Sequence, residues 1–194
     1  MLGKNKIIII TLSTMLLISS LVAGEFKAEQ PILITTAGQS ADVLMVKVLA
    51  KKAGLDFTVD KLATSTSLGK AKSLIIVTGG STKGLGAAKI DKDDEISRVQ
   101  TLITAAKKQN IPIVTMHIGG KARRGSLSDE FNSVASQAGS CLVVVEGGNE
   151  DGYFTKVAET NKVPLIMIKK IIEVKSVLTN IFGPEIGRAS CRER

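Results

Sequence analysis

The sequence has no tryptophan and only one tyrosine and five phenylalanines in 194 residues. Aromatic rings form the platforms on which nucleic-acid bases and sugars stack, so their scarcity argues against both kinds of surface. The net charge of +8 falls to +5 without the two terminal segments described below, because they hold five of the 26 cations and two of the 18 acids. A dedicated nucleic-acid binder is more basic than this, so we predict no nucleic-acid partner.

Cysteine and histidine are also scarce, with two cysteines and one histidine in the whole chain. Cys191 lies in the last ten residues, so Cys141 has no intramolecular disulfide partner in the predicted domain. Cys141 opens an apolar run, which favours a buried small hydrophobic residue over a reactive thiol. His117 and Cys141 supply too few ligands for a metal site of their type, so we predict no metal and no cofactor.

The first 24 residues are typical of a signal peptide. Lys4 and Lys6 precede an apolar stretch, Ile7 to Ala23, and Gly24 completes a small-residue cleavage site. We therefore expect an exported protein, periplasmic or extracellular. The alternative is an uncleaved anchor, since this 17-residue stretch, apolar apart from scattered serine and threonine, reaches the lower limit for a span. We predict membrane contact only through this segment.

The last ten residues, 185–194, back-translate into a common short-read sequencing adapter, so we expect genuine coding to end near Pro184. Residues 25–184 then form one domain of about 160 residues, a length that suits a single core.

Short apolar runs alternate with amphipathic stretches along this domain. Expected strands are Ile32–Thr36, Phe57–Val59, Leu74–Thr78, Ile113–Met116, Leu142–Val145 and Leu165–Ile168. Expected helices are Ala41–Ala53, Asp93–Lys108, Leu127–Ala138, Tyr153–Thr160 and Ile171–Phe182, with 64–72 as a loop or one short helix. This order predicts an α/β doubly wound three-layer sandwich with a five- or six-stranded parallel sheet. We favour a flavodoxin-like strand order over the dinucleotide-binding order.

Acidic residues crowd the start of the second expected helix, at Asp91, Asp93, Asp94 and Glu95. Acids at this position complement the helix dipole, so we favour helix capping by this cluster over a metal site.

Glycine-rich polar segments follow four of the expected strands, and parallel strands bring such segments to one edge of the sheet. Glycine allows close backbone approach, and the cations in two of these segments suit carboxylate or phosphate groups. The sequence therefore predicts a site for a small anionic molecule at this edge. Each feature also has a simpler explanation: the glycines form turns, the cations are solvated, and His117 is a buried, hydrogen-bonded residue. The candidate ligand-binding residues are Gln39, Ser40, Gly79, Gly80, Lys83, His117, Gly119, Gly120, Lys121, Arg123, Arg124, Gly147, Gly148 and Asn149.

Known catalytic and phosphate-binding motifs are incomplete. Lys83 is not followed by serine or threonine as in a P-loop, and Gly84-Leu-Gly86 does not extend to GxGxxG. No GxSxG nucleophile elbow occurs. We therefore favour a non-enzymatic binding module. One alternative is a hydrolase or transferase with His117 as general acid or base, assisted by Glu146 or Asp151. Another alternative is a surface protein-docking module. A Mg²⁺ or Ca²⁺ ion bound by the carboxylates of Glu146, Glu150 and Asp151 is a further alternative, for which the sequence gives no other support.

Four segments together resemble a family of small exported bacterial proteins of unknown function. They carry TAGQSAD, GGSTKGLGAA, HIGGKARRG and EGGNEDG, within 31–42, 77–88, 117–125 and 146–152. The resemblance covers about residues 31–182. It implies an exported single domain, and it brings no reaction, ligand or catalytic residue.

Overall fold

A computed structural model describes residues 26–183. The predicted signal peptide and the adapter-like tail lie outside these residues, so both stay predictions. None of the helices within residues 26–183 combines the length and the apolar character needed to cross a bilayer.

Six parallel strands form one sheet, and they follow the predicted runs to within one residue at either end. Their order is β2-β1-β3-β4-β5-β6, which confirms the flavodoxin-like arrangement. Most of these strands have no polar alternation because helices cover both faces of the sheet. The strands are β1 (Ile32–Ala37), β2 (Phe57–Val59), β3 (Ser73–Thr78), β4 (Ile113–His117), β5 (Cys141–Val145) and β6 (Leu165–Ile168).

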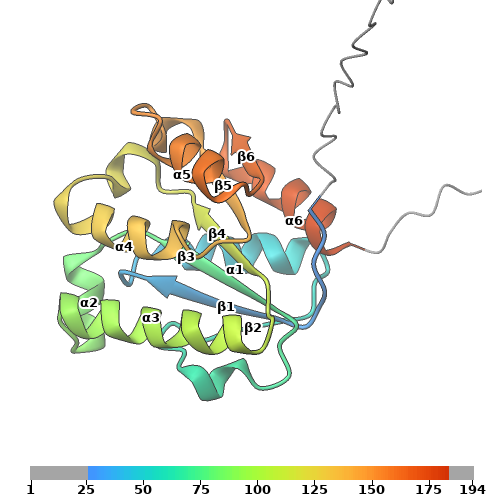
Figure 1. The fold of residues 1–194 in the computed structure, drawn as a ribbon, viewed down its shortest axis with the longest axis horizontal. Helices are drawn as coiled ribbons and strands as arrows, with labels where there is room; N and C mark the ends of the chain where they lie inside the picture. The colour runs from blue at the N-terminus through green and yellow to red at the C-terminus, as the bar shows by residue number, and fades with distance from the viewer. Residues whose placement is uncertain (1–25, 184–194) are drawn as a thin grey trace, which may run out of the picture.

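Helices lie on both sides of the sheet and complete the three layers (Figure 1). One core lies between the sheet and helices α1 and α6, and further apolar clusters lie under α3, α4 and α5 on the opposite face. Cys141 is fully buried in the first core, which confirms the predicted burial, and burial raises the pKa of its thiol to about 12. The helices are α1 (Asp42–Lys52), α2 (Thr82–Ala88), α3 (Lys92–Lys108), α4 (Ser126–Ser136), α5 (Tyr153–Asn161) and α6 (Val174–Phe182). Short 3-10 turns are η1 (Ser65–Leu68), η2 (Gly120–Arg123), η3 (Glu146–Gly148) and η4 (Ile171–Glu173).

Two helix starts show how local chemistry sets the fold. The Asp91 side chain accepts a hydrogen bond from the Asp94 backbone N–H, so Asp91 is the N-cap of α3 and the predicted helix capping is confirmed. The sequence predicts a glycine-rich loop after β3, and this prediction is wrong in part, because helix α2 begins at Thr82. Ser81 starts this helix by accepting a hydrogen bond from the Gly84 N–H.

Candidate functional site

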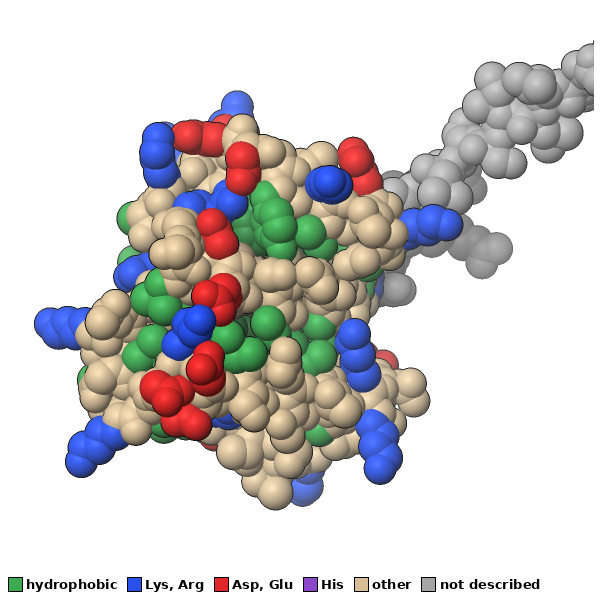
Figure 2. Space-filling model, turned by 60° about the vertical axis from the view of Figure 1, so that its left-hand side comes forward, with side chains coloured by type: hydrophobic (Ala, Val, Ile, Leu, Met, Phe, Trp, Pro, Cys, Tyr) green, Lys and Arg blue, Asp and Glu red, His purple; other side chains and the backbone are tan. Residues whose placement is uncertain are grey.

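The four glycine-rich segments meet where the strands end, at the carboxyl edge of the sheet. Gln39 forms a β-bridge with Gly80, which joins the segments after β1 and β3. The η2 and η3 turns, which follow β4 and β5, contact each other. Figure 2 brings this edge forward and shows acidic and basic side chains lying next to one another. The predicted convergence is therefore present, but the cations lie among carboxylates.

Arg123 connects three segments of the carboxyl edge. Its Nε donates to Asp42 Oδ2 in the first turn of α1 at 3.1 Å, and its Nη1 donates to the Gly80 carbonyl oxygen at 3.1 Å. The side chain passes so close to Gly79 and Gly119 that a Cβ at either glycine would meet it. These two glycines therefore make room for an arginine of the protein itself.

Arg124 connects α4 to the segment after β5. Its Nε donates to Asp129 Oδ1 at 2.7 Å, while Nη1 and Nη2 donate to the two carboxylate oxygens of Asp151 at 2.8 and 2.7 Å. Nη1 also donates to the Gly148 carbonyl oxygen, and the guanidinium carbon lies 5.5 Å from the centre of the Tyr153 ring. All three guanidinium nitrogens therefore have partners within the protein.

The pKa shifts around Arg124 follow from this pairing. The hydrogen bond to Asp151 is the largest cause that raises the Arg124 pKa, and the same bond lowers the pKa of Asp151 to about 2. Burial acts to raise the pKa of Asp129, but the hydrogen bonds from Arg124, the Gly125 N–H and Asn132 outweigh it and lower that pKa. All three groups are charged at neutral pH.

His117 is fully buried, and the protein occupies both of its ring nitrogens. Nδ1 lies 3.2 Å from Asn132 Oδ1, and Nε2 lies 3.3 Å from the Gly120 carbonyl oxygen. Burial is the largest cause that lowers the His117 pKa. Gly148 packs directly against the imidazole, where a Cβ would collide with it. This geometry favours the buried, hydrogen-bonded histidine over the general acid or base.

A buried ion pair also supports the same edge, and the sequence interpretation missed it. Glu95, assigned to the acidic start of α3, is 0% exposed. It receives two hydrogen bonds from Arg98 at 2.7 and 2.8 Å, one from the Gly38 N–H and one from Gln39 Nε2. Gln39 has a φ of 57°, which is a left-handed conformation. Because Glu95 accepts hydrogen bonds from Gly38 and Gln39, it holds the first glycine segment in this turn. The sequence contained a signal for the burial of Glu95, because its spacing places it on the same helix face as Val99 and Leu102.

The remaining candidates divide into residues that form structural hydrogen bonds and lysines exposed to solvent. The Ser40 hydroxyl accepts a hydrogen bond from the Asp42 N–H, and the Asn149 side chain bonds the Phe154 N–H at the start of α5. Lys83 is exposed on α2. The Lys121 side chain is 83% exposed, and its Nζ lies 3.6 Å from a Glu150 carboxylate oxygen. Ser40 and Asn149 therefore have structural partners, while the two lysines face solvent.

Acidic residues at this edge form no metal centre. Within the described part of the chain, His, Cys, Asp and Glu side chains gather in no group of three that could hold a metal ion. The alternative of a cation near Glu146, Glu150 and Asp151 therefore gains no support, and Asp151 is bonded to Arg124 instead.

The family of the chain follows from its sequence. The model of a family described as a domain of unknown function, DUF6305, matches residues 29–182. The chain belongs to the DUF6305 family. This supports the resemblance to a family of unknown function, while export stays a prediction. A search of curated proteins finds no match for this DUF6305 domain.

Solved structures show only distant likeness to the DUF6305 domain. A GDSL-like lipase from Bacteroides thetaiotaomicron is 12% identical, with a TM-score of 0.34, and the match covers 70% of this chain and 66% of the lipase. A putative acylhydrolase from Bacteroides fragilis is 13% identical over 75% of this chain and 72% of that one, with a TM-score of 0.33. A Schiff-base-forming fructose-1,6-bisphosphate aldolase is 13% identical over 78% and 82%, with a TM-score of 0.34. These scores carry no argument about activity.

Proposed function

We propose that the DUF6305 domain is a non-enzymatic binding module that holds a small anion between Lys121 and Arg124. The observation that carries this proposal is the way these cations are paired. Both lie on or beside η2, and both reach across to neighbouring acids of one exposed segment, Glu150 and Asp151. The two acidic side chains are 64% and 55% exposed, so an anion from solution has access to the place that they occupy.

The hydrogen bonds of Arg124 make this exchange specific. Asp151 binds the Nη1–Nη2 fork, which is the donor pair that carboxylates and phosphates recognise in a two-pronged manner. The Nε bond to Asp129 is independent of that fork, and Asp129 is held in turn by the Gly125 N–H and Asn132 Nδ2. An incoming anion can therefore replace Asp151 while Arg124 stays fixed by Asp129.

The same geometry favours binding over catalysis. The only histidine uses both ring nitrogens for contacts within the protein, and the fully buried Ser40 hydroxyl accepts a backbone N–H. A serine nucleophile needs a base within hydrogen-bonding reach. His117 and Ser40 form no hydrogen bond with each other, so they do not form such a pair. Arg123, also predicted as a ligand-binding residue, is assigned a structural role here because it joins Asp42 to Gly80.

Titration calorimetry with inorganic phosphate and citrate tests this function. The Asp151→Asn variant should bind these anions more tightly than the wild type, by up to about fivefold, because the anion no longer competes with an exposed ion pair. Lys121→Gln should weaken binding. Glu159→Gln, which removes an exposed acid from α5, is the matched control for net charge. Equal affinities in the wild type and Asp151→Asn, or an equal gain in Glu159→Gln, would overturn the proposal.

A further inference from the structure

Helix α1 exposes large apolar side chains on its outer side. Leu44, Met45 and Val48 are 50, 46 and 47% exposed, although the opposite side of the same helix is buried in the core. Ile171 and Ile172 in the η4 turn are 38 and 60% exposed. These five residues are most of the seven large apolar side chains that residues 26–183 expose, so the exposure is concentrated in two segments, α1 and η4.

Helices α1 and α6 form one layer on the same face of the sheet. They contact each other, and their buried sides share one apolar cluster. Each helix follows a parallel strand, so both begin at the carboxyl edge, where η4 leads into α6. We call the outer side of this layer the α1/α6 face, defined by Leu44, Met45, Lys47, Val48, Lys51, Lys52, Ile171, Ile172 and Lys175.

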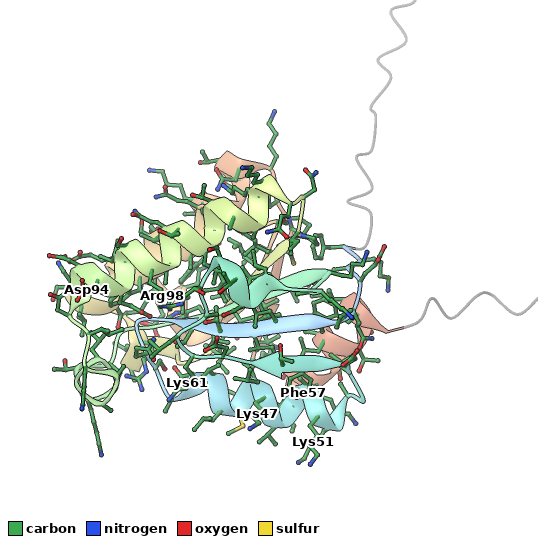
Figure 3. The ribbon with its side chains drawn as sticks, turned by 90° about the horizontal axis from the view of Figure 1, so that it is seen from below. Lys47, Lys51, Phe57, Lys61, Asp94 and Arg98 are labelled. Carbon is green, nitrogen blue, oxygen red and sulfur yellow. The ribbon has the colours of Figure 1, made fainter. Side chains whose placement is uncertain are left out.

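Lysines surround the exposed apolar residues. Figure 3 shows Lys47 and Lys51 on the side of α1 that is turned away from the sheet. The stretches 42–52 and 169–182 contain six lysines and two acids. Of these acids, Asp42 is paired with Arg123, and the Glu173 carboxylate accepts the backbone N–H groups of residues 169 and 170. The α1/α6 face is therefore basic as well as apolar.

This combination identifies the chemistry of the partner. A second copy of the chain, docked through the same face, would place lysine against lysine, which charge repulsion opposes. A helix with exposed apolar side chains flanked by lysines suits the boundary between headgroups and acyl chains in a negatively charged bilayer. Phe26, where the described chain begins, packs against the α1/α6 core cluster, and the apolar stretch 7–23 precedes it in sequence by only a few residues.

We propose that the α1/α6 face docks on the surface of an anionic lipid bilayer. Leu44, Met45 and Val48 enter the interface, while Lys47, Lys51 and the neighbouring lysines contact the headgroup phosphates. This surface shares no residue with the proposed anion site, and it extends the expectation that only the N-terminal segment meets a membrane.

The absence of tryptophan allows a direct test in the full chain. Val48→Trp places a single tryptophan on the α1/α6 face, and Gln100→Trp places one at an exposed position of α3 on the opposite face. With vesicles of phosphatidylcholine and phosphatidylglycerol, the emission of Val48→Trp should shift to shorter wavelengths. Gln100→Trp should not shift, and neither variant should shift with phosphatidylcholine alone. Because both chains have the same N-terminal segment, a difference between them reports on the face itself.

The lysines are tested in the Val48→Trp background. Lys47→Gln with Lys51→Gln should raise the lipid concentration for half-maximal shift by about 30-fold, since each lysine near an anionic surface contributes about fivefold. Lys107→Gln with Lys108→Gln, at the end of α3, removes the same charge from the opposite face and should have little effect.

Three results would overturn the proposal. The first is an unshifted Val48→Trp spectrum with anionic vesicles, or an equal shift in Gln100→Trp. The second is a shift that depends on protein concentration without lipid, which would identify a second copy of the chain as the occupant. The third is a shift with soluble polyglutamate and none with vesicles, which would identify an acidic polypeptide.

Discussion

Replacing Glu95 with alanine should destabilise the domain more than the loss of any surface ion pair. Glu95 is 0% exposed, and the Arg98 side chain that it neutralises is 12% exposed. Removal of the carboxylate leaves a largely buried guanidinium without its charge partner, and it also frees the Gly38 N–H. Breaking a buried pair in this way costs about 3–5 kcal/mol. For a domain of this size, each kcal/mol lowers Tm by about 2–4 °C, so the expected loss is about 6–20 °C.

The assay is thermal and denaturant unfolding of wild type and Glu95→Ala, followed by circular dichroism, which give Tm and the free energy of unfolding. The matched control is Lys92→Ala, which removes a salt bridge of similar length, 2.9 Å to Glu130, from an exposed position and should change stability little. The double variant Glu95→Ala with Arg98→Ala should lose less stability than the sum of the single variants, because contacting residues couple. A loss below about 1 kcal/mol in Glu95→Ala, or strict additivity in the double variant, would refute the reasoning.

Two further predictions concern the core of the carboxyl edge. Because burial lowers the folded-state pKa of His117, the unfolded chain binds a proton that the folded chain does not, so stability should fall as pH drops below about 6.5. His117→Gln should flatten this slope in thermal unfolding measured from pH 7 to pH 5, and an unchanged slope would contradict the assignment. In α2, Gly84→Ala should destabilise the domain because its Cβ would collide with the Gln39 backbone, whereas Gly86→Ala meets open space and should be neutral or stabilising by up to about 1 kcal/mol. Equal effects of the two alanines on Tm would show that the Gly84–Gln39 contact is not required.

Sequence patterns were most informative where one physical effect dominates. The runs that became β1 to β6 are mostly apolar and rich in β-branched residues, and a sheet covered on both faces selects such runs over three to six residues. Helix α3 was predictable from its apolar stripe and its Asp91 cap. In α2, by contrast, Gly84 and Gly86 have low helix propensity, so the segment was interpreted as a loop although the Ser81 cap and tertiary packing make it helical.

The candidate site shows a different limit. The sequence placed Arg123, Arg124 and His117 at the carboxyl edge, because parallel strands bring the following segments together. It did not reveal that Asp42, Asp129 and Asp151 neutralise the two arginines, because Asp42 and Asp151 lie 81 and 27 residues from their partners and Asp129 lies on the following helix, α4. Pairing over such separations depends on the tertiary arrangement of α1, α4 and the segment after β5. The composition gives the number of charged side chains, but only the fold shows which of them form pairs.

The central claim is that an anion takes the place of Asp151 on the Arg124 fork. Its most direct test is the Kd of inorganic phosphate for Asp151→Asn compared with wild type, measured by calorimetry at neutral pH, where Asp151 is ionised. The account predicts tighter binding in the variant, by up to about fivefold, and reversal of this gain when Lys121 is also changed to glutamine. Binding that is unchanged or weaker in Asp151→Asn would show that the Arg124–Asp151 pair is structural and that the anion site lies elsewhere.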